Sequence, residues 1–294
     1  MDVTKFLPLD LFAGRVVFVT GGGSGINLGI ASAFAALGAD VAICGRSADR
    51  LAGAAEQLNG FGHRVLTQVA DVRDAEQLAA ALDASERSAG PADVVVCGAA
   101  GNFVAAAENL SPNGFRTVVD IDLLGSFNTS RAAFDQLRRT RGALLFVSAA
   151  QAYLPFAYQA HVGAAKAGVD SLMRNLALEW GRYGIRSNSI VPGPTAGTEG
   201  MRRLGDVAGE ETWTSMVPLG RYAELEEIAA MAVVLCSPLA AYVTGAQVIV
   251  DGGQGLSGSA LFNNAVGTAL DKMPDAVPDR VPDAVPADAV SGTR

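Results

Sequence analysis

Lys166 and Asp122 are the two side chains whose types and settings most directly suggest chemistry. Lys166 lies in QAHVGAAKAG (159–168) and begins a strongly amphipathic helical pattern. Asp122 belongs to VDIDLLGSFN, where a second carboxylate, Asp120, precedes it by two positions. On a helix such residues point about 200° apart, so only one of them can face a shared site. A lysine and a carboxylate at one site could bind hydroxyls and stabilise developing charge.

A glycine-rich turn, TGGGSGINLG at 20–29, follows the first apolar run. Glycine lets the backbone pass close to a pyrophosphate, and the helix that follows offers unpaired N–H groups at its positive end. Asn27 stands where a third glycine is usual, and we expect Gly29 to relieve some of the crowding. The predicted dinucleotide-binding residues of this turn are Gly21, Gly23, Ser24, Gly25 and Ile26.

The second apolar run ends in Cys44-Gly45-Arg46-Ser47, which favours NADPH over NADH. A protein that binds NAD by its ribose hydroxyls usually has a carboxylate at this strand end. Gly45 stands there instead, and the guanidinium of Arg46 could grip a 2′-phosphate in bidentate fashion. The alternative is that Arg46 is only a solvated surface charge.

Short apolar runs alternate with helix-like stretches along most of the chain. The runs are VVFVT (16–20), DVAIC (40–44), RVLTQ (64–68), DVVVC (93–97), ALLFVS (143–148), RSNSIV (186–191) and AQVIV (246–250). Several are continuously apolar, which is typical of a sheet covered on both faces. We therefore expect an α/β, doubly wound Rossmann fold with a parallel sheet of about seven strands and helices on both faces.

The predicted domain organisation is one domain over residues 1–262 and a tail over 263–294. The tail contains prolines at 274, 278, 282 and 286 in an approximate VPDA repeat. Proline at that density disfavours helix and sheet pairing. The segment is predicted to be disordered and extended, and a partner-binding role is the open alternative.

The composition limits the function classes. The net charge of −8 gives no electrostatic footprint for nucleic acid. Cys44, Cys97 and Cys236 lie far apart in the sequence and suit a reducing compartment. No apolar run reaches a membrane span, and the N-terminus lacks a signal-peptide pattern. Because the chain ends in Ser-Gly-Thr-Arg rather than a peroxisomal signal, we expect a bacterial, cytoplasmic protein.

The order of these motifs resembles the short-chain dehydrogenase/reductase family from about residue 15 to residue 253. Asp71-Val72 ends the third run, where the family holds the adenine, and the segment 98–101 stands where the family has NNAG. The segment 192–195 resembles the turn that faces the nicotinamide. The resemblance implies that NADP(H) is also bound by Asp71, Val72, Ala99, Ala100, Gly101, Lys166, Pro192, Gly193 and Thr195.

The usual proton donor of this family is missing. Members carry a tyrosine four residues before the lysine, because i and i+4 share one helix face, and a serine further back. Here those positions are Val162 and Ala149, and the family's asparagine is Asp122. The changes argue against ketone reduction. The site is either inactive, with Lys166 kept for the cofactor ribose, or suited to a reaction that needs no strong acid at oxygen.

A closer resemblance is to the peroxisomal type of 2,4-dienoyl-CoA reductases, which also lack the tyrosine. It implies NADPH-dependent reduction of a 2,4-dienoyl-CoA to a 3-enoyl-CoA in the beta-oxidation of unsaturated fatty acids. Another enoyl-CoA or enone substrate, and a cofactor-binding protein without catalysis, stay open. The resemblance rests on AAGNF (99–103), VDIDLLGSFNTSR (119–131), HVGAAKAGVDSLMR (161–174), EWG (179–181), PGPTAGTEGMRRLG (192–205), SPLAAYVTGA (237–246) and DGG (251–253).

The resemblance implies that Lys166, Asp122 and Asp251 are the catalytic residues. It points Asp122 inward, where it would hold the lysine or order a proton-donating water, or serve only as a structural partner. Asp251 would reach the substrate or merely cap a turn. Tyr153 is another candidate proton donor, because it lies two residues from Gln151, where a mitochondrial type carries its tyrosine.

The implied partners are an acyl-CoA substrate and further copies of the chain. Arg202 and Arg203 would bind coenzyme A phosphates at a substrate lid, or only form a solvated helix face. Helices such as the one after Lys166 pair across subunits in this family, which implies a homotetramer or homodimer. His161 is expected to be packed or at the surface, with no metal site. The predicted substrate contacts are Asn102, Phe103, Gly200, Arg202 and Arg203.

Overall fold

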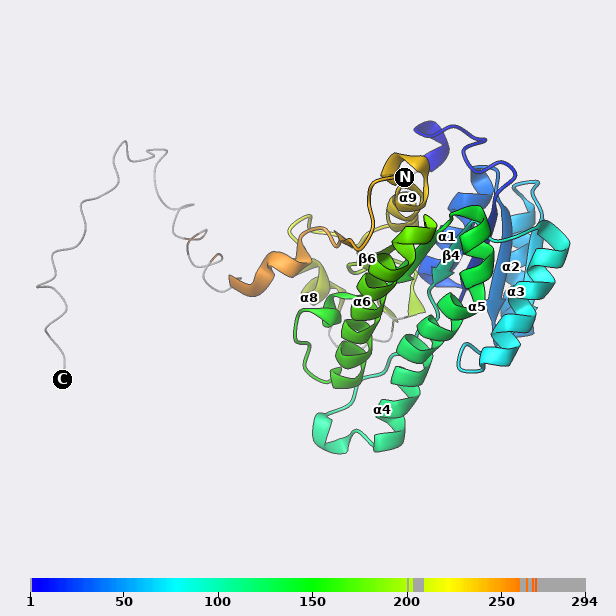
Figure 1. The fold of residues 1–294 in the computed structure, drawn as a ribbon. Helices are drawn as coiled ribbons and strands as arrows, with labels where there is room; N and C mark the ends of the chain where they lie inside the picture. The colour runs from blue at the N-terminus through cyan, green and yellow to red at the C-terminus, as the bar shows by residue number, and fades with distance from the viewer. Residues whose placement is uncertain are drawn as a thin grey trace, which may run out of the picture. The chain divides into compact units, whose positions relative to one another are not determined.

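The predicted strands form one parallel sheet in the computed structural model, which describes residues 2–199, 201–202, 209–259, 263, 266 and 268 (Figure 1). Within these residues the seven strands are ordered β3-β2-β1-β4-β5-β6-β7. No predicted strand boundary differs from the observed one by more than one residue, so the fold class is confirmed. The strands are β1 (Val16–Thr20), β2 (Asp40–Gly45), β3 (Val65–Val69), β4 (Val94–Cys97), β5 (Ala143–Val147), β6 (Arg186–Pro192) and β7 (Gln247–Val250).

Helices cover both faces of this sheet (Figure 1). Helices α1, α2 and α9 pack on one face, and α3, α5 and α6 pack on the other. The helices are α1 (Gly25–Ala36), α2 (Ala48–Asn59), α3 (Ala75–Ala89), α4 (Pro112–Val119), α5 (Gly125–Thr140), α6 (Ala160–Trp180), α8 (Glu210–Ser215) and α9 (Leu225–Cys236). Short 3-10 turns lie at Val3–Lys5, Ala107–Asn109, Ala150–Ala152, Gly181–Tyr183, Pro238–Ala240 and Gln254–Ser259.

The burial of the strands follows from this double cover. Strands β1 and β4 lie inside the sheet and are buried at every position, as their continuous apolar sequences require. Strand β7 lies at the edge of the sheet, and its Ile249 is half exposed. The two layers of core are anchored by fully buried aromatic side chains, Phe34 on one face and Phe18 and Phe146 on the other.

A π-helical turn, Asp120–Leu124, joins α4 to α5 without a break in the helical backbone. Such turns shift the direction of side chains relative to a regular helix and often occur at functional sites. Asp122 points into the protein and is 1% exposed, whereas Asp120 remains partly exposed. The turn therefore settles which of the two carboxylates faces the interior.

The chain divides into two compact units, residues 1–255 and residues 256–294. The sheet and all the helices named above from α1 to α9 belong to the first unit. Apart from residues 263, 266 and 268, the predicted tail lies outside the described residues, so its predicted boundary and disorder stay predictions. None of the helices in the described part of the chain is long and apolar enough to cross a membrane.

Candidate active site

A cleft of about 930 Å³ lies across the carboxyl ends of the central strands. From β1 the chain builds the sheet toward β3, and from β4 it builds the sheet toward β7. Ligands of doubly wound sheets bind at such a switch point. The cleft brings together most of the predicted site residues: Gly21, Gly23, Ser24, Gly25, Ile26, Arg46, Asp71, Val72, Ala99, Ala100, Gly101, Asn102, Asp122 and Lys166.

The glycine turn after β1 fits the pyrophosphate of a dinucleotide. Gly21 has a φ of 71°, and a Cβ there would lie only 2.9 Å from Nδ2 of Asn27. Ser24 is the N-cap of α1, yet its side chain makes no capping hydrogen bond. The first N–H groups of α1 are therefore left for an anion, which the helix dipole also favours.

Asn27 places a polar side chain beside Gly98, directly after β4. Its Nδ2 donates to the Gly98 carbonyl at 2.8 Å, which ties α1 to the end of β4. A Cβ on Gly98 would lie 2.2 Å from Asn27 Oδ1, so the amide fills the space of a side chain at position 98. Gly29 faces α9 instead of the turn, where its Cβ would lie 3.2 Å from Leu225 Cβ. The expectation that Gly29 relieves crowding at the pyrophosphate turn was therefore wrong.

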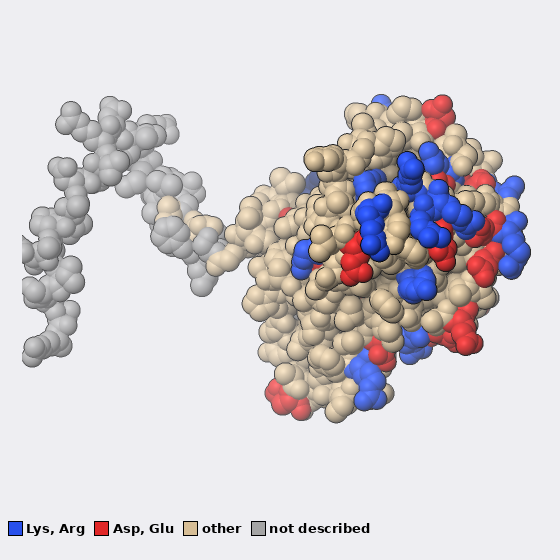
Figure 2. Space-filling view, viewed as in Figure 1, with Lys and Arg blue, Asp and Glu red and all other residues tan. Residues whose placement is uncertain are grey.

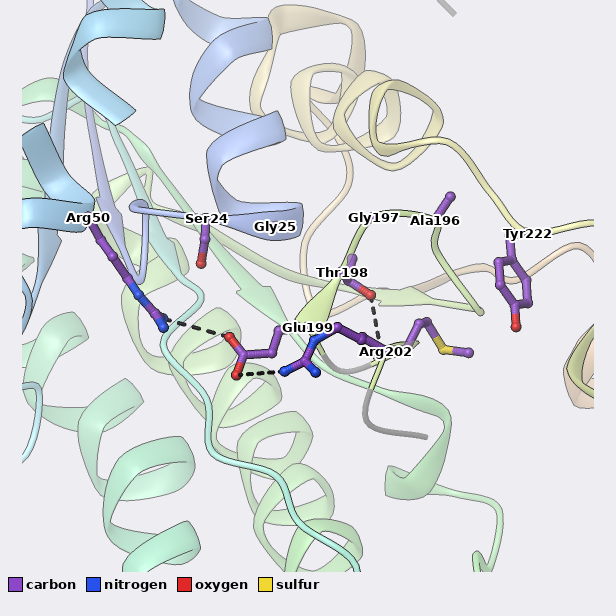
Figure 3. A pocket seen from close by; sticks show the side chains of 10 residues that line it. Ser24, Gly25, Arg50, Ala196, Gly197, Thr198, Glu199, Arg202 and Tyr222 are labelled. Atoms are coloured by element: carbon purple, nitrogen blue, oxygen red, sulfur yellow. Dashed lines mark hydrogen bonds and ion pairs between the residues drawn. The ribbon is translucent and has the colours of Figure 1, made fainter. Parts of the chain in front are cut away.

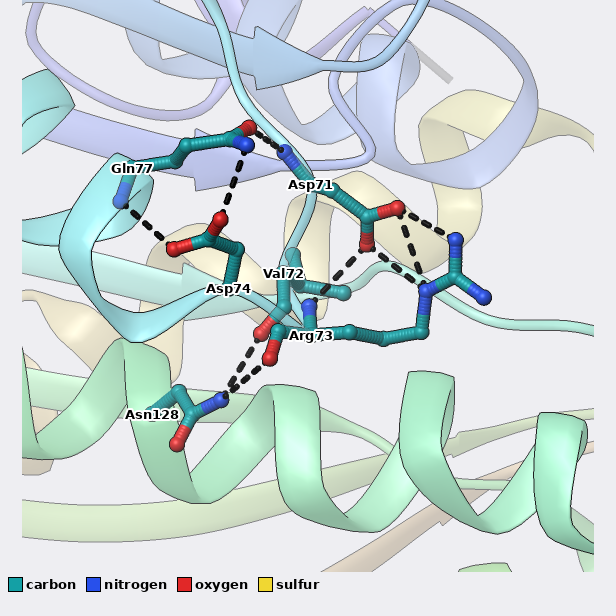
Figure 4. Close-up of polar contacts among 6 residues, drawn as sticks. All are labelled: Asp71, Val72, Arg73, Asp74, Gln77 and Asn128. Carbon is teal, nitrogen blue, oxygen red and sulfur yellow. Dashed lines mark hydrogen bonds and ion pairs between the residues drawn. The ribbon is translucent and has the colours of Figure 1, made fainter.

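The carboxylate of Asp71 is held by a neighbouring arginine at the edge of the cleft (Figure 4). Nε and Nη2 of Arg73 both donate to it, and these bonds hold the pKa of Asp71 below its usual range. Asn128 Nδ2 donates to the Val72 carbonyl at 3.0 Å and fixes the same turn from α5. Arg46 follows β2, lines the cleft and is exposed.

Lys166 and Asp122 form a buried ion pair in the cleft wall. Lys166 Nζ lies 3.2 Å from Asp122 Oδ2 and donates a hydrogen bond to the Val147 carbonyl at 2.9 Å. Asp122 Oδ1 accepts from the Gly101 N–H at 2.7 Å. The Nζ–Oδ2 contact lacks hydrogen-bond alignment, and Oδ2 accepts no hydrogen bond from the described residues. One carboxylate oxygen therefore keeps acceptor capacity inside the site.

Val162 and Ala149 line the same cleft at the positions of the missing tyrosine and serine. Val162 lies one turn before Lys166 on α6 and packs against Val118 and Ala165. Ala149 follows β5. Neither side chain can exchange a proton with a ligand, so proton transfer at this end of the cleft must involve other groups or water.

His161 directly precedes Val162 on α6 and is fully buried. Its ring lies 4.2 Å from the ring of Phe103, centroid to centroid, and neither ring nitrogen makes a well-formed hydrogen bond. Burial holds the pKa of His161 below its usual range, against the opposing effects of the Phe103 backbone and Asp122. Among the described residues, no group of three or more His, Cys, Asp or Glu is placed to hold a metal ion.

Asp251 does not border the cleft; its carboxylate caps the turn after β7. Oδ1 accepts from the Gly253 N–H at 2.8 Å, and Oδ2 accepts from the Gly255 N–H at 2.7 Å. Tyr153 lies nearby, since a Cβ on Gly255 would be 3.1 Å from Asp251 Oδ2 and 3.3 Å from the Tyr153 hydroxyl. Burial, followed by the charges of Asp251 and Asp170, raises the pKa of Tyr153.

Pro192 ends β6, Gly193 and Thr195 follow it, and none of the three borders the cleft. A Cβ on Gly193 would lie 2.6 Å from Asp251 Cα, so the two turns pack too closely for any other residue. Thr195 is buried, and its hydroxyl donates to the Gly193 carbonyl at 2.9 Å. These contacts hold the turn after β6 in place.

A second hollow continues the cleft past the glycine turn, bordered by Arg50 of α2 and by the loop after β6 (Figure 3). Glu199 lies between two guanidinium groups, 3.8 Å from Arg50 and 3.9 Å from Arg202. Sequence patterns had not indicated Arg50, because its role depends on α2 facing this loop. Of the other predicted substrate contacts, Phe103 packs against His161 with the two rings tilted, whereas Gly200 and Arg203 lie outside the described residues.

A buried carboxylate, Asp170, was also missed from the sequence. It lies one turn after Lys166 on α6 and is 2% exposed. Ser148 Oγ and Gln247 Nε2 both donate to its Oδ2, so it joins α6 to β5 and β7. The available signal was a lone acidic residue on the apolar face of an amphipathic helix.

The chain is similar to known reductases. A family model described as enoyl-(acyl carrier protein) reductase matches residues 21–254. The chain is 45% identical over 248 residues to a peroxisomal 2,4-dienoyl-CoA reductase ((3E)-enoyl-CoA-producing) of Saccharomyces cerevisiae, covering 83% of this chain and 85% of the relative. It is 43% identical over 264 residues to the Arabidopsis thaliana protein of the same name, covering 86% and 88%.

Solved structures of short-chain oxidoreductases share the fold. An NADPH-bound short-chain oxidoreductase from Pseudomonas aeruginosa PAO1, described as containing an atypical catalytic center, is 32% identical with a TM-score of 0.76. The match covers 82% of this chain and 97% of that one. The family match over residues 21–254 spans strands β2 to β7, the residues that line the cleft and the Lys166–Asp122 pair.

Proposed function

The chain belongs to the short-chain dehydrogenase/reductase family, and we propose that it is an NADPH-dependent reductase that converts a 2,4-dienoyl-CoA to a 3-enoyl-CoA. One observation carries the proposal. The cleft that holds the glycine turn and Arg46 also contains a buried Lys166–Asp122 pair, while the phenol and hydroxyl positions hold Val162 and Ala149. Two relatives at 43–45% identity are named for this reaction.

The cofactor proposed is NADP(H), which supplies the hydride when bound. The N-terminus of α1 would bind the pyrophosphate, and Arg46 would bind the 2′-phosphate. Asp71 and Val72 would border the adenine, and Lys166 would bind ribose hydroxyls. The P. aeruginosa structure named above supports NADPH, because its description reports that cofactor.

The reaction proposed needs charge stabilisation more than a strong acid. Hydride addition at the far end of the diene spreads negative charge over a dienolate that ends at the thioester oxygen. Lys166 and the preorganised N–H groups of the cleft would stabilise that charge. Asp122 Oδ2, which keeps acceptor capacity, would order a water that delivers the proton to the alpha carbon. The addition of one hydride and one proton thus leaves one of the two double bonds, at position 3.

The substrate contacts stay part of this proposal. Asn102 borders the cleft beside Asp122 and would face the thioester. Arg202 borders the second hollow, where the phosphates of coenzyme A would be held. Asp251, which caps the turn after β7, would act by holding the Gly193 turn that packs against it.

We also propose that the protein forms a homotetramer or homodimer. Its compartment would be reducing and cytoplasmic, and its reaction would be a step in beta-oxidation. Exposed apolar side chains on α4 to α6 and at the edge of the sheet support subunit pairing: Phe115, Leu124, Phe127, Leu178, Leu239, Tyr242 and Ile249. Figure 2 shows that charged side chains of both signs gather toward α2, α3 and α5, and that much of the remaining face is uncharged. The three cysteines are free and buried.

The test is to mix the purified protein with NADPH and 2,4-dienoyl-CoA of several chain lengths. Loss of NADPH absorbance with formation of a 3-enoyl product is expected, and product analysis separates it from a 2-enoyl product. Turnover only with simple 2-enoyl-CoA or with non-CoA enones would favour another reductase. NADPH binding without oxidation by any of these substrates would show a cofactor-binding protein instead.

A further inference from the structure

Three carboxamide side chains form a continuous hydrogen-bonded row, the amide relay, beside the catalytic pair. Gln151 Nε2 donates to Gln159 Oε1 at 2.7 Å, and Gln159 Nε2 donates to Asn102 Oδ1 at 3.0 Å. Gln151 and Asn102 border the cleft, whereas Gln159 is 4% exposed and lies behind it. The buried glutamine therefore connects two polar groups of the cleft wall.

The relay has a direction. Gln159 Oε1 accepts from Gln151, and Gln159 Nε2 donates to Asn102 Oδ1. Asn102 Oδ1 therefore points toward Gln159. The amide nitrogen of Asn102 is then the polar atom of that side chain that can serve as a donor in the cleft. Hydrogen bonds in a row also polarise one another, which strengthens donation at Asn102.

The backbone around the relay is held in place by the same part of the fold. Ala105 N–H donates to the Tyr158 carbonyl at 3.0 Å, and the Phe103 ring packs against His161. Tyr158 itself has a φ of 67°, a left-handed conformation that a bulky residue rarely adopts. Local strain of this kind persists where the surrounding structure fixes it, and here it precedes the residue that turns inward, Gln159.

We propose that Gln159 is a positioning residue that fixes the Asn102 carboxamide with its N–H groups toward the substrate. The inference rests on the proposed dienoyl-CoA reduction, in which negative charge develops at the thioester oxygen. A donor held at Asn102 stabilises that charge, and an Asn102 turned the other way would present an oxygen and repel it. Gln159 touches neither substrate nor cofactor and acts only through Asn102.

The decisive variant is Gln159→Glu, which keeps the size of the side chain. As a carboxylate it can only accept, so it forces Asn102 Nδ2 toward itself and Oδ1 toward the cleft. As a carboxylic acid it can again donate to Asn102 Oδ1. Burial raises the pKa of a carboxyl group, so this switch falls within an accessible pH range.

We expect Gln159→Glu to lower kcat/KM for the dienoyl-CoA by about 10- to 100-fold at pH 8, with little change in NADPH affinity. Relative to the wild type, activity should return as the pH is lowered to 5.5. Gln159→Met removes both hydrogen bonds, and its loss of activity should not depend on pH.

The matched control is Gln136→Glu. Gln136 is also 4% exposed and bonds to the Ala92 N–H and the Leu82 carbonyl, away from the cleft. It should lose stability without any recovery of kcat/KM at low pH. Wild-type kcat/KM in Gln159→Glu, a loss that does not reverse at low pH, or the same recovery in Gln136→Glu would overturn the proposal.

Failure of the proposed function is recognised separately, because it appears as absent turnover in the wild type. In that case the side-chain amide signals of Asn102 in ¹⁵N-labelled protein test the relay. These signals should titrate with pH in Gln159→Glu and stay unchanged in Gln136→Glu. A signal that does not titrate in Gln159→Glu would overturn the relay without reference to substrate.

Discussion

The ammonium of Lys166 and the carboxylate of Asp122 lie 3.2 Å apart inside the cleft wall, with less than a tenth of either side chain exposed. A buried pair of this kind gains little net stability over an apolar pair, but the loss of one partner leaves the other as an uncompensated charge. Substitutions in this pair should therefore affect both the stability of the fold and the activity.

Lys166→Met and Asp122→Asn should each destabilise the protein by about 3–5 kcal/mol, because each leaves a buried group without its partner. The double variant should recover part of that loss, as urea unfolding would show. All three should lose at least about 100-fold in kcat/KM. Asp135→Asn, which breaks the exposed pair with Arg138, is the control and should cost under about 1 kcal/mol. Strict additivity of the two buried substitutions would contradict this coupling.

Tyr153→Phe should change kcat by less than about threefold, because the hydroxyl lies beside Asp251 and not in the cleft. Burial raises the pKa of Tyr153, so the phenol stays protonated near neutral pH and its ionisation gives no loss of activity there. The measurement is a pH–rate profile, with exposed Tyr158→Phe as the control. A loss of 10²–10⁴-fold together with a lost alkaline limb would identify Tyr153 as the proton donor after all.

The fold could be predicted from the sequence because its signals are local. Continuous apolar runs such as β1 and β4 are buried on both faces, and the glycine turn follows β1 directly. Lys166 and Val162 lie one turn apart on α6, so the family pattern could be matched there, and Ala149 was found by counting back along the same pattern.

The remaining site features depend on contacts between distant segments. Gln159 and Asn102 are 57 residues apart, and Asn27 and Gly98 are 71 apart, so no local pattern joins them. Asp251 shows a different limit. An aspartate before two glycines suits both a turn cap and a ligand contact, and only the packed backbone decides where its oxygens point.

Gly45→Asp should reduce the preference for NADPH. The new Cβ would lie 3.7 Å from Leu51, an ordinary contact, and its carboxylate would repel the 2′-phosphate while accepting from ribose hydroxyls. We expect NADPH to bind at least about tenfold more weakly, with NADH less affected. Gly53→Asp, which adds the same charge at an exposed position of α2, is the control. Equal losses of NADPH affinity in the two variants would show that the end of β2 is not part of the cofactor site.

Glu227 should make stability depend on pH in the acid range. Hydrogen bonds from Arg221 and from the Glu224 backbone lower the pKa of Glu227 to about 2. Because the folded-state pKa is depressed, the stabilisation is complete above pH 4.5 and is lost as the pH falls toward 2. Glu227→Gln should therefore lower the Tm at pH 7 but not at pH 2. Exposed Glu226→Gln, in the same turn of α9, should have little effect at either pH, and a constant Tm difference for Glu227→Gln would refute the linkage.

Asn27 and Gly98 should behave as a coupled pair, since the amide of one occupies the side-chain space of the other. Asn27→Gly removes the bond to the Gly98 carbonyl, and Gly98→Asn forces a side chain into the Asn27 carboxamide. Each should destabilise the protein by about 1–3 kcal/mol. The double substitution moves the amide to the strand and should cost at least about 1 kcal/mol less than the sum. Denaturant unfolding of the four proteins measures this coupling, and additive losses would mean that the two positions are independent.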